Sequence, residues 1–291
     1  MSFTRIVAAV AATAGLLFAS STFAAPAAAF KVEVTGNASG APMILIPGLA
    51  SSGAVWDGTV QRYCGARRCH VLTLAGFASV PAIDGPLLAT AEQQLSEYIA
   101  ANKLAQPVIV GHSLGGFLAL KLAADHPEQV GRLVIVDSLP AMAAIQMPSI
   151  TGPQMKEMAA AVRARMLSMD TAAQQAGQLQ TLRTMITGAD DVQRALAWGR
   201  QSDRTTVANA MAELMGEDLR QEVARIKAPT LVLGSWIAYQ NFGSKEQFLQ
   251  AYQGQYSKLA GVKVEMADNA RHFIMLDDPR WMYDRIDQFL N

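Results

Sequence analysis

The chain has 291 residues, of which 51% are hydrophobic and only 16% are charged, so a disordered or fibrous protein is excluded and one globular domain with an elaboration is expected. Its 24 Lys and Arg residues balance its 24 Asp and Glu residues, which gives no reason to expect nucleic acid or an anionic membrane surface as a partner. The function must therefore be sought in motifs and in their positions along the chain.

The first residues are typical of a secretory signal peptide. Arg5 precedes an apolar stretch from Ile6 to Phe18, and small residues follow over 20–25. We therefore expect residues 1–24 to be cleaved off and the protein to be exported, either to the periplasm or into the medium. A stable membrane anchor is not expected, because spanning a bilayer takes about 20 apolar residues and this stretch is shorter.

From Phe30 onward, short apolar runs alternate with helical periodicities. The runs expected to form strands cover 30–35, 43–46, 70–74, 107–110, 133–136, 230–233 and 262–265. Helical patterns cover 88–99, 116–124 and 279–290. Short strands that are buried on both faces and separated by helices predict an α/β fold with a mostly parallel, doubly wound sheet.

The chain contains one pair of cysteines, Cys64 and Cys69, with four residues between them. In an exported protein we expect these two to form a local disulfide, with two free thiols as the alternative. Closing so short a loop should contribute about 2 kcal/mol. Neither a further cysteine nor closely spaced histidines complete a ligand set, so no metal site is expected.

The section 138–226 differs from the rest of the chain. It lacks strand-like runs and holds nine of the fourteen methionines. We interpret it as a helical lid inserted into a core formed by 30–137 and 227–291. Methionine is flexible and polarizable, which favours an accommodating apolar pocket under this lid, although ordinary helix packing explains any single methionine equally well.

The segment Gly111-His112-Ser113-Leu114-Gly115 stands between an expected strand and an expected helix. In that context G-x-S-x-G is typical of a nucleophile elbow, whose strained turn lifts the serine hydroxyl clear of the sheet. Gly111 and Gly115 have no Cβ that could collide with the neighbouring strand and helix. We therefore predict that Ser113 is a nucleophile; the alternative is a glycine-rich turn with an incidental serine.

Together with Pro47-Gly48-Leu49, Trp56 and Arg271-His272-Phe273, this elbow resembles the α/β-hydrolase superfamily. The resemblance runs from about residue 40 to the C-terminus and is to the lid-bearing branch of small esterases, lipases and carbon–carbon bond hydrolases. It implies a Ser–acid–His triad in that chain order. It also implies an oxyanion hole with two backbone donors, here Leu49 and Leu114.

His272 is the predicted base, because of four histidines it alone lies on a loop between a late strand and the terminal helix. In much of the family the acid follows the strand that corresponds here to 230–233, but no carboxylate follows it in this chain. The other family position follows the strand after the elbow, where Asp137 stands, and we assign the acid role to Asp137. Asp268 is a poorer candidate, because its short side chain would have to fold back.

We predict an exported serine hydrolase that cleaves a small-to-medium apolar carboxylic ester, thioester or lactone through an acyl-enzyme intermediate. The expected partner is a small-molecule apolar acyl substrate, and neither a metal nor an organic cofactor is implied. A peptidase or a carbon–carbon bond hydrolase is an alternative, because fold and triad do not fix the bond that is cleaved. A slow or non-catalytic ligand-binding, sensing protein is the alternative from another class, favoured by the missing carboxylate after Leu233.

Overall fold

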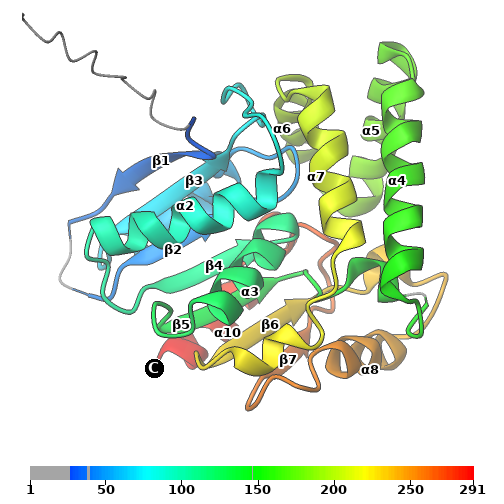
Figure 1. Ribbon diagram of the computed structural model, residues 1–291. Coiled ribbons are helices and arrows are strands. Elements are labelled where there is room, and N and C mark those ends of the chain that lie inside the picture. Colours follow the sequence, from blue (N-terminus) through cyan, green and yellow to red (C-terminus); the bar gives the residue numbers. More distant parts are fainter. Residues whose placement is uncertain (1–26, 38–39, 146) are drawn as a thin grey trace, which may run out of the picture.

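The computed structural model describes residues 27–37, 40–145 and 147–291 (Figure 1). The predicted signal peptide, residues 1–24, lies outside this part of the chain. Among the described residues, no helix combines the length and apolar character needed to cross a membrane.

A seven-stranded sheet in the order β1-β3-β2-β4-β5-β6-β7 forms the centre of the molecule. Its strands are β1 (Phe30–Thr35), β2 (Met43–Ile46), β3 (Cys69–Leu74), β4 (Val108–His112), β5 (Arg132–Val136), β6 (Thr230–Gly234) and β7 (Lys263–Met266). Only the pairing of β1 with β3 is antiparallel, and all other neighbours are parallel. The predicted mostly parallel α/β sheet is confirmed.

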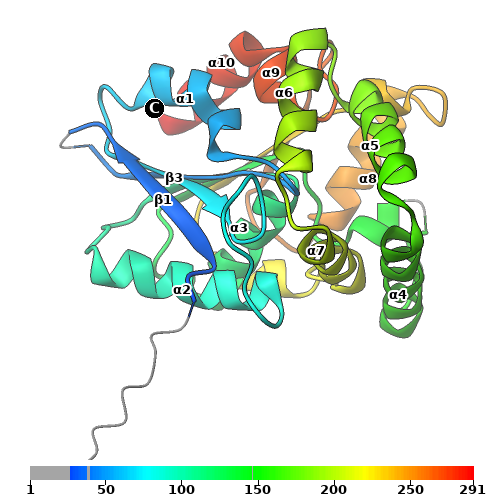
Figure 2. The ribbon, with the colours of Figure 1, turned by 90° about the horizontal axis from the view of Figure 1, so that it is seen from above.

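The helices cover both faces of this sheet. Outside the segment between β5 and β6 they are α1 (Asp57–Tyr63), α2 (Leu87–Ala101), α3 (Leu114–Asp125), α8 (Lys245–Gln255), α9 (Ile274–Asp277) and α10 (Pro279–Leu290). Short 3-10 turns are η1 (Gly53–Trp56), η2 (Met142–Ile145), η3 (Glu222–Arg225) and η4 (Ile237–Tyr239). Figure 2 shows α1 and α10 on one side of the sheet and α2 on the other.

The strands have apolar side chains on both faces because each face is covered. Ile109 and Ile135 belong to the core cluster under α2 and α3, whereas Val110 and Val134 belong to the cluster under α1 and α10. Alternate residues of a strand point to opposite faces, so continuous apolar runs are what such a sheet requires.

The cysteines Cys64 and Cys69 form the expected disulfide. It joins the end of α1 to the first residue of β3. Both sulfur-bearing residues are buried, so the bond forms part of the core beneath α1.

Among the described residues, four α-helices lie between β5 and β6, and we call them the inserted helices: α4 (Gly152–Ser168), α5 (Thr171–Met185), α6 (Ala189–Arg200) and α7 (Arg204–Gly216). They stand together at one end of the sheet (Figure 1). α4 packs along α7, and α5 packs against α6. On α4 only Met155 and Ala159 are buried, and on α5 only Leu182, so these two helices present most of their surface to solvent.

Candidate active site

Ser113 occupies a sharp turn between β4 and α3. Its backbone has φ 53° and ψ −121°, a conformation that is strained for a residue with a side chain. The turn is held by hydrogen bonds from the Ser113 N–H to the Val136 carbonyl (3.0 Å) and from the Phe117 N–H to the Ser113 carbonyl (3.0 Å). The predicted elbow is therefore present as a strand–turn–helix unit.

Two glycines allow this turn to pack closely. A Cβ on Gly115 would lie 2.4 Å from the carbonyl oxygens of both Ile46 and Pro47, and a Cβ on Gly111 would lie 2.3 Å from the Gly115 carbonyl oxygen. Such distances are far shorter than any real Cβ contact. The glycines of the motif are therefore required by close backbone approach, as the sequence indicates.

The loop after β2 lies against the elbow. A Cβ on Gly48 would be 3.2 Å from the Ser113 Cβ and 3.0 Å from the His112 Nδ1 atom. Leu49, a predicted oxyanion donor, is therefore next in sequence to a glycine whose missing side chain leaves room for the serine. Leu114, the other predicted donor, is the first residue of α3, where helix N–H groups have no intrahelical acceptor and favour negative charge.

Ser51 closes the turn of this loop. Its N–H donates to the Gly48 carbonyl (3.3 Å) and its hydroxyl donates to the Leu49 carbonyl (3.2 Å). Both bonds are local, of the kind that serine makes in turns. They fix the backbone of Gly48 and Leu49 beside Ser113.

Asp137 and His272 are brought together from opposite halves of the core. The Nδ1 atom of His272 lies 2.7 Å from Oδ2 of Asp137. Asp137 directly follows β5, is 6% exposed and has a φ of 48°, which makes it a second residue with a left-handed backbone at the same sheet edge as Ser113. Asp268, the alternative acid, is exposed and pairs with Lys245 instead (2.6 Å).

His272 lies beside the elbow, because its ring packs against the ring of His112. The ring centroids of the two histidines are 4.6 Å apart, and His112 directly precedes Ser113. None of the hydrogen bonds found among the described residues joins the Ser113 hydroxyl to the His272 ring. Catalytic hydrogen bonds of this kind are often long without substrate and shorten only in the reacting complex.

His112 is itself a support of the His272 loop. Its Nε2 atom lies 3.0 Å from the His272 carbonyl oxygen, and since a carbonyl can only accept, Nε2 carries the proton. Complete burial, and secondarily the neighbouring His272, hold the pKa of His112 well below its usual range. His112 therefore stays neutral and acts as a donor that fixes the loop backbone.

The Asp137 carboxylate accepts hydrogen bonds from two further residues. Ser235, just after β6, donates its N–H to Oδ1 (2.6 Å) and its hydroxyl to Oδ2 (2.8 Å). Tyr252 on α8 donates its hydroxyl to Oδ1 (2.8 Å). Burial, and secondarily the Asp137 charge, raise the pKa of Tyr252 well above its usual range, so the phenol stays protonated and able to donate.

The sequence did not point to Tyr252, and it pointed to Ser235 only as the place where a carboxylate is missing. Tyr252 lies 115 residues from Asp137 on an amphipathic helix, where a buried tyrosine is indistinguishable from ordinary core. One feature of the sequence could have indicated the contact between Ser235 and Asp137: each residue stands just after a predicted strand. Parallel strands end at one edge of a sheet, so these residues had to be close.

The His272 loop is also attached to the inserted helices. Asp277 accepts from the Thr187 N–H (2.8 Å), the Thr187 hydroxyl (3.0 Å) and the Arg271 N–H (2.9 Å). The Phe273 N–H donates to the Met185 carbonyl (3.2 Å). The residues on both sides of His272 thus hold the junction between α5 and α6.

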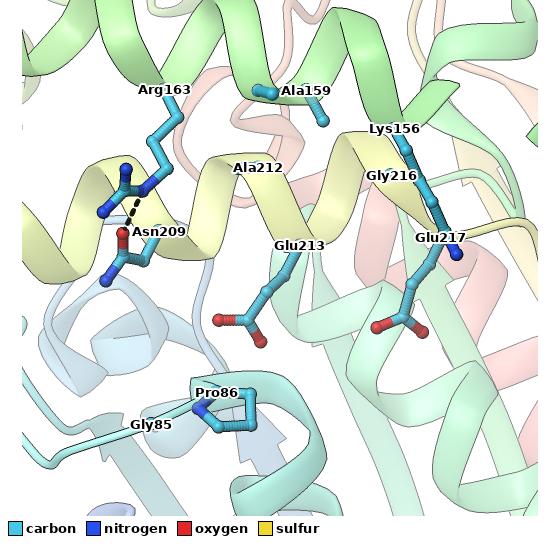
Figure 3. A pocket seen from close by; sticks show the side chains of 11 residues that line it. Gly85, Pro86, Lys156, Ala159, Arg163, Asn209, Ala212, Glu213, Gly216 and Glu217 are labelled. Atoms are coloured by element: carbon cyan, nitrogen blue, oxygen red, sulfur yellow. Dashed lines mark hydrogen bonds between the residues drawn. The ribbon is translucent and has the colours of Figure 1, made fainter. Parts of the chain in front are cut away.

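A separate open hollow of about 560 Å³ lies between α4, α7 and the loop before α2 (Figure 3). Its wall includes Lys156 and Arg163 from α4 and Glu213 from α7. Both Glu213 carboxylate oxygens accept backbone N–H groups at the start of α2, from Leu87 and Leu88. Neither Ser113 nor His272 lines this hollow, so it is distinct from the candidate active site.

Over the described part of the chain, no group of three or more His, Cys, Asp or Glu side chains is arranged to hold a metal ion. The chemistry that the site can carry out is that of its serine, histidine and carboxylate: nucleophilic attack, proton transfer, and stabilisation of charge by backbone dipoles.

A seven-stranded α/β sheet with a serine elbow and an Asp–His pair at one edge defines the α/β-hydrolase class of fold. The chain belongs to the Alpha/beta hydrolase family, whose model matches residues 43–285. An esterase from Exiguobacterium antarcticum has a similar structure, with a TM-score of 0.75 and 16% identity over 90% of this chain and 95% of that chain. The enol-lactonase from Burkholderia xenovorans LB400 gives a TM-score of 0.71 and 19% identity over 90% and 96%.

Sequence relatives include two pimeloyl-[acyl-carrier protein] methyl ester esterases. The protein from Nitrosomonas europaea is 29% identical over 217 residues, which cover 71% of this chain and 80% of that protein. The protein from Aeromonas hydrophila is 35% identical over 124 residues, which cover 41% of this chain and 47% of that protein. The second match thus spans less than half of its relative.

Proposed function

We propose that this chain is a serine esterase that hydrolyses small-to-medium apolar carboxylic esters, including thioesters and lactones, through an acyl-enzyme. The observation that carries the proposal is the 2.7 Å contact between His272 Nδ1 and Asp137 Oδ2, at the sheet edge where Ser113 occupies a strained elbow. Strained residues persist where the fold imposes them and are common at active sites.

In the first half-reaction, the Ser113 hydroxyl oxygen attacks the ester carbonyl carbon while Nε2 of His272 takes the hydroxyl proton. The carbonyl oxygen becomes an oxyanion, stabilised by the N–H groups of Leu49 and Leu114. The carbon–oxygen bond to the alcohol then breaks, and the alcohol leaves with the proton from His272. The acyl group remains on Ser113.

In the second half-reaction, a water molecule attacks the acyl carbon while His272 takes one of its protons. The bond to the Ser113 oxygen breaks, the proton returns to Ser113, and a carboxylic acid is released. By accepting from Nδ1–H, the Asp137 carboxylate holds the tautomer whose Nε2 can take a proton, and it stabilises the imidazolium that forms.

Three further parts of the proposal concern access to Ser113, the location of the protein and the bond that is cleaved. The inserted helices, within 138–226, are proposed to form a lid that sets which acyl groups reach Ser113. Residues 1–24 are proposed to direct export to the periplasm or the medium. The choice of an ester over a peptide or carbon–carbon bond is supported by the two sequence relatives described above, which are methyl ester esterases.

A non-catalytic sensing protein is less well supported than an esterase. The argument for it was the missing carboxylate after Leu233. Asp137 lies at the end of the adjacent strand and contacts the His272 ring, so the histidine has an acid partner. The specific reason to expect a defective site is thereby removed.

The experiment uses the purified protein, a short-chain p-nitrophenyl ester and a fluorophosphonate label. We expect prompt turnover and one label per chain, located on Ser113 by mass spectrometry. Ser113→Ala should lower kcat/KM by a factor on the order of 10⁴ or more and abolish labelling. Ser138→Ala removes another buried serine hydroxyl near the elbow and should retain both turnover and labelling. A wild-type protein that neither turns over nor takes the label contradicts the proposal.

A further inference from the structure

We propose that Tyr252 and Ser235 are positioning residues, which hold the Asp137 carboxylate so that an acid just after β5 replaces the acid absent after β6. The inference deepens the proposed function and rests on it. It names two residues for which neither the family resemblance nor the sequence motifs give a role.

The first step is that the acceptor capacity of Asp137 is full. A carboxylate offers about four lone-pair positions. Oδ1 accepts from the Ser235 N–H and the Tyr252 hydroxyl, and Oδ2 accepts from the Ser235 hydroxyl and from Nδ1 of His272. With all positions used, the carboxylate plane is fixed and one oxygen is aimed at the imidazole.

Ser235 stands just after β6, where much of the family carries its acid. It supplies two hydrogen-bond donors instead. The Asp137 N–H also donates to the Leu233 carbonyl (2.7 Å), so the ends of β5 and β6 are joined on both sides of the carboxylate. This doubled attachment keeps Asp137 in its left-handed backbone conformation, with φ 48°.

α8 and its C-cap residue carry three buried polar side chains, and all three bind the segment 137–141. The Tyr256 hydroxyl donates to the Ser138 carbonyl (2.8 Å), and Gln255 accepts from the Ala141 N–H (2.9 Å). Tyr252 differs from both because it contacts the carboxylate itself. Tyr256 is therefore a matched control: a fully buried tyrosine at the C-cap of the same helix, with a hydroxyl bond of the same length to a neutral acceptor.

The charged and titratable groups around the pair are few. His272 contacts Asp137 directly, and His112 contacts the His272 loop. Burial, and secondarily the Asp137 charge, raise the pKa of Tyr239 and of Tyr256. No lysine or arginine side chain of the described residues hydrogen-bonds to Asp137. Its charge is stabilised by neutral donors, so losing one of them leaves a buried charge underpaired.

The experiment compares Tyr252→Phe with Tyr256→Phe on the whole protein. In Tyr252→Phe we expect kcat for the p-nitrophenyl ester to fall about tenfold with KM unchanged, since a hydrogen bond to a charged group is lost. The low-field proton NMR resonance of the bond between His272 Nδ1 and Asp137 should shift or broaden. In Tyr256→Phe, kcat and the low-field resonance should both stay as in the wild type. Wild-type kcat and resonance in Tyr252→Phe, or equal changes in both variants, overturn the proposal.

Ser235 gives a second test in case Tyr252→Phe does not fold. Ser235→Ala removes only the hydroxyl donor to Oδ2, and we expect it to shift the same resonance and lower kcat. Ser235→Thr keeps a hydroxyl and should restore the resonance and kcat. An unchanged resonance in Ser235→Ala overturns the role of Ser235. Because the resonance needs no turnover, it reports on positioning even if the wild type proves inactive, which would instead contradict the proposed function.

Discussion

Two regions of the molecule differ in how densely they are packed. One is the sheet edge that carries the candidate site, and the other is the group of inserted helices. Strands β4 and β5 are buried almost throughout, and both Ser113 and Asp137 follow them directly in left-handed backbone conformations. Helices α4 and α5 bury only Met155, Ala159 and Leu182. Strained geometry can be maintained only where dense packing over-determines it. The inserted helices α4 and α5 are thus the less densely packed of the two regions.

The two regions meet at the His272 loop. Asp277 and Arg271, on either side of His272, bind the α5–α6 junction through Thr187, Arg183 and Ile186. A shift of the inserted helices would therefore reach the loop that carries His272. Three predictions sharpen or break this comparison.

The largest effect is expected at the rigid sheet edge. Asp137→Asn removes the acceptor that holds the His272 tautomer, and kcat for the p-nitrophenyl ester should fall by about 10⁴-fold. Stopped-flow or progress-curve kinetics measure this loss, and circular dichroism establishes that the variant is folded. Asp268→Asn alters an exposed carboxylate near the same loop and should keep wild-type rates. Wild-type activity in Asp137→Asn would mean that Asp137 is not the acid partner of His272.

The second prediction concerns stability. Ile135→Ala, at a fully buried position of β5, should lower the free energy of unfolding by about 4 kcal/mol, because a large cavity opens among residues that cannot collapse into it. Leu182→Ala, at the one buried position of α5, should cost about 2 kcal/mol, since its surroundings can relax. Urea denaturation of both variants measures the difference. Equal losses would mean that α5 is packed as tightly as the sheet.

The smallest effect is expected at the contact between the regions. Thr187→Val removes the hydroxyl bond to Asp277 while keeping the N–H bond, and should raise the barrier to the reaction by about 1 kcal/mol, seen as a fall in kcat. Thr184→Val is the matched control, because the Thr184 hydroxyl bonds only within its own helix, to the Thr181 carbonyl. If both variants behave alike, the contact does not position His272.

Much of the core could be predicted from local sequence. The β2, β4, β5 and β6 strands were recognisable as apolar runs, and the elbow was recognisable because glycine, serine and glycine stand at fixed spacing between a strand and a helix. Proximity of Cys64 to Cys69 also followed from short separation along the chain. Each of these depends on interactions between near neighbours.

The sequence by itself determined the sheet, the elbow at Ser113 and the residue types available for acid and base, because apolar periodicity and turn chemistry are local properties. Only the tertiary structure decided that Asp137 and not Asp268 meets His272, and that Ser235 and Tyr252 complete the carboxylate's hydrogen bonds. Those contacts join residues about a hundred or more positions apart. They exist because parallel strands end at one edge and α8 packs beside that edge, which no local pattern encodes.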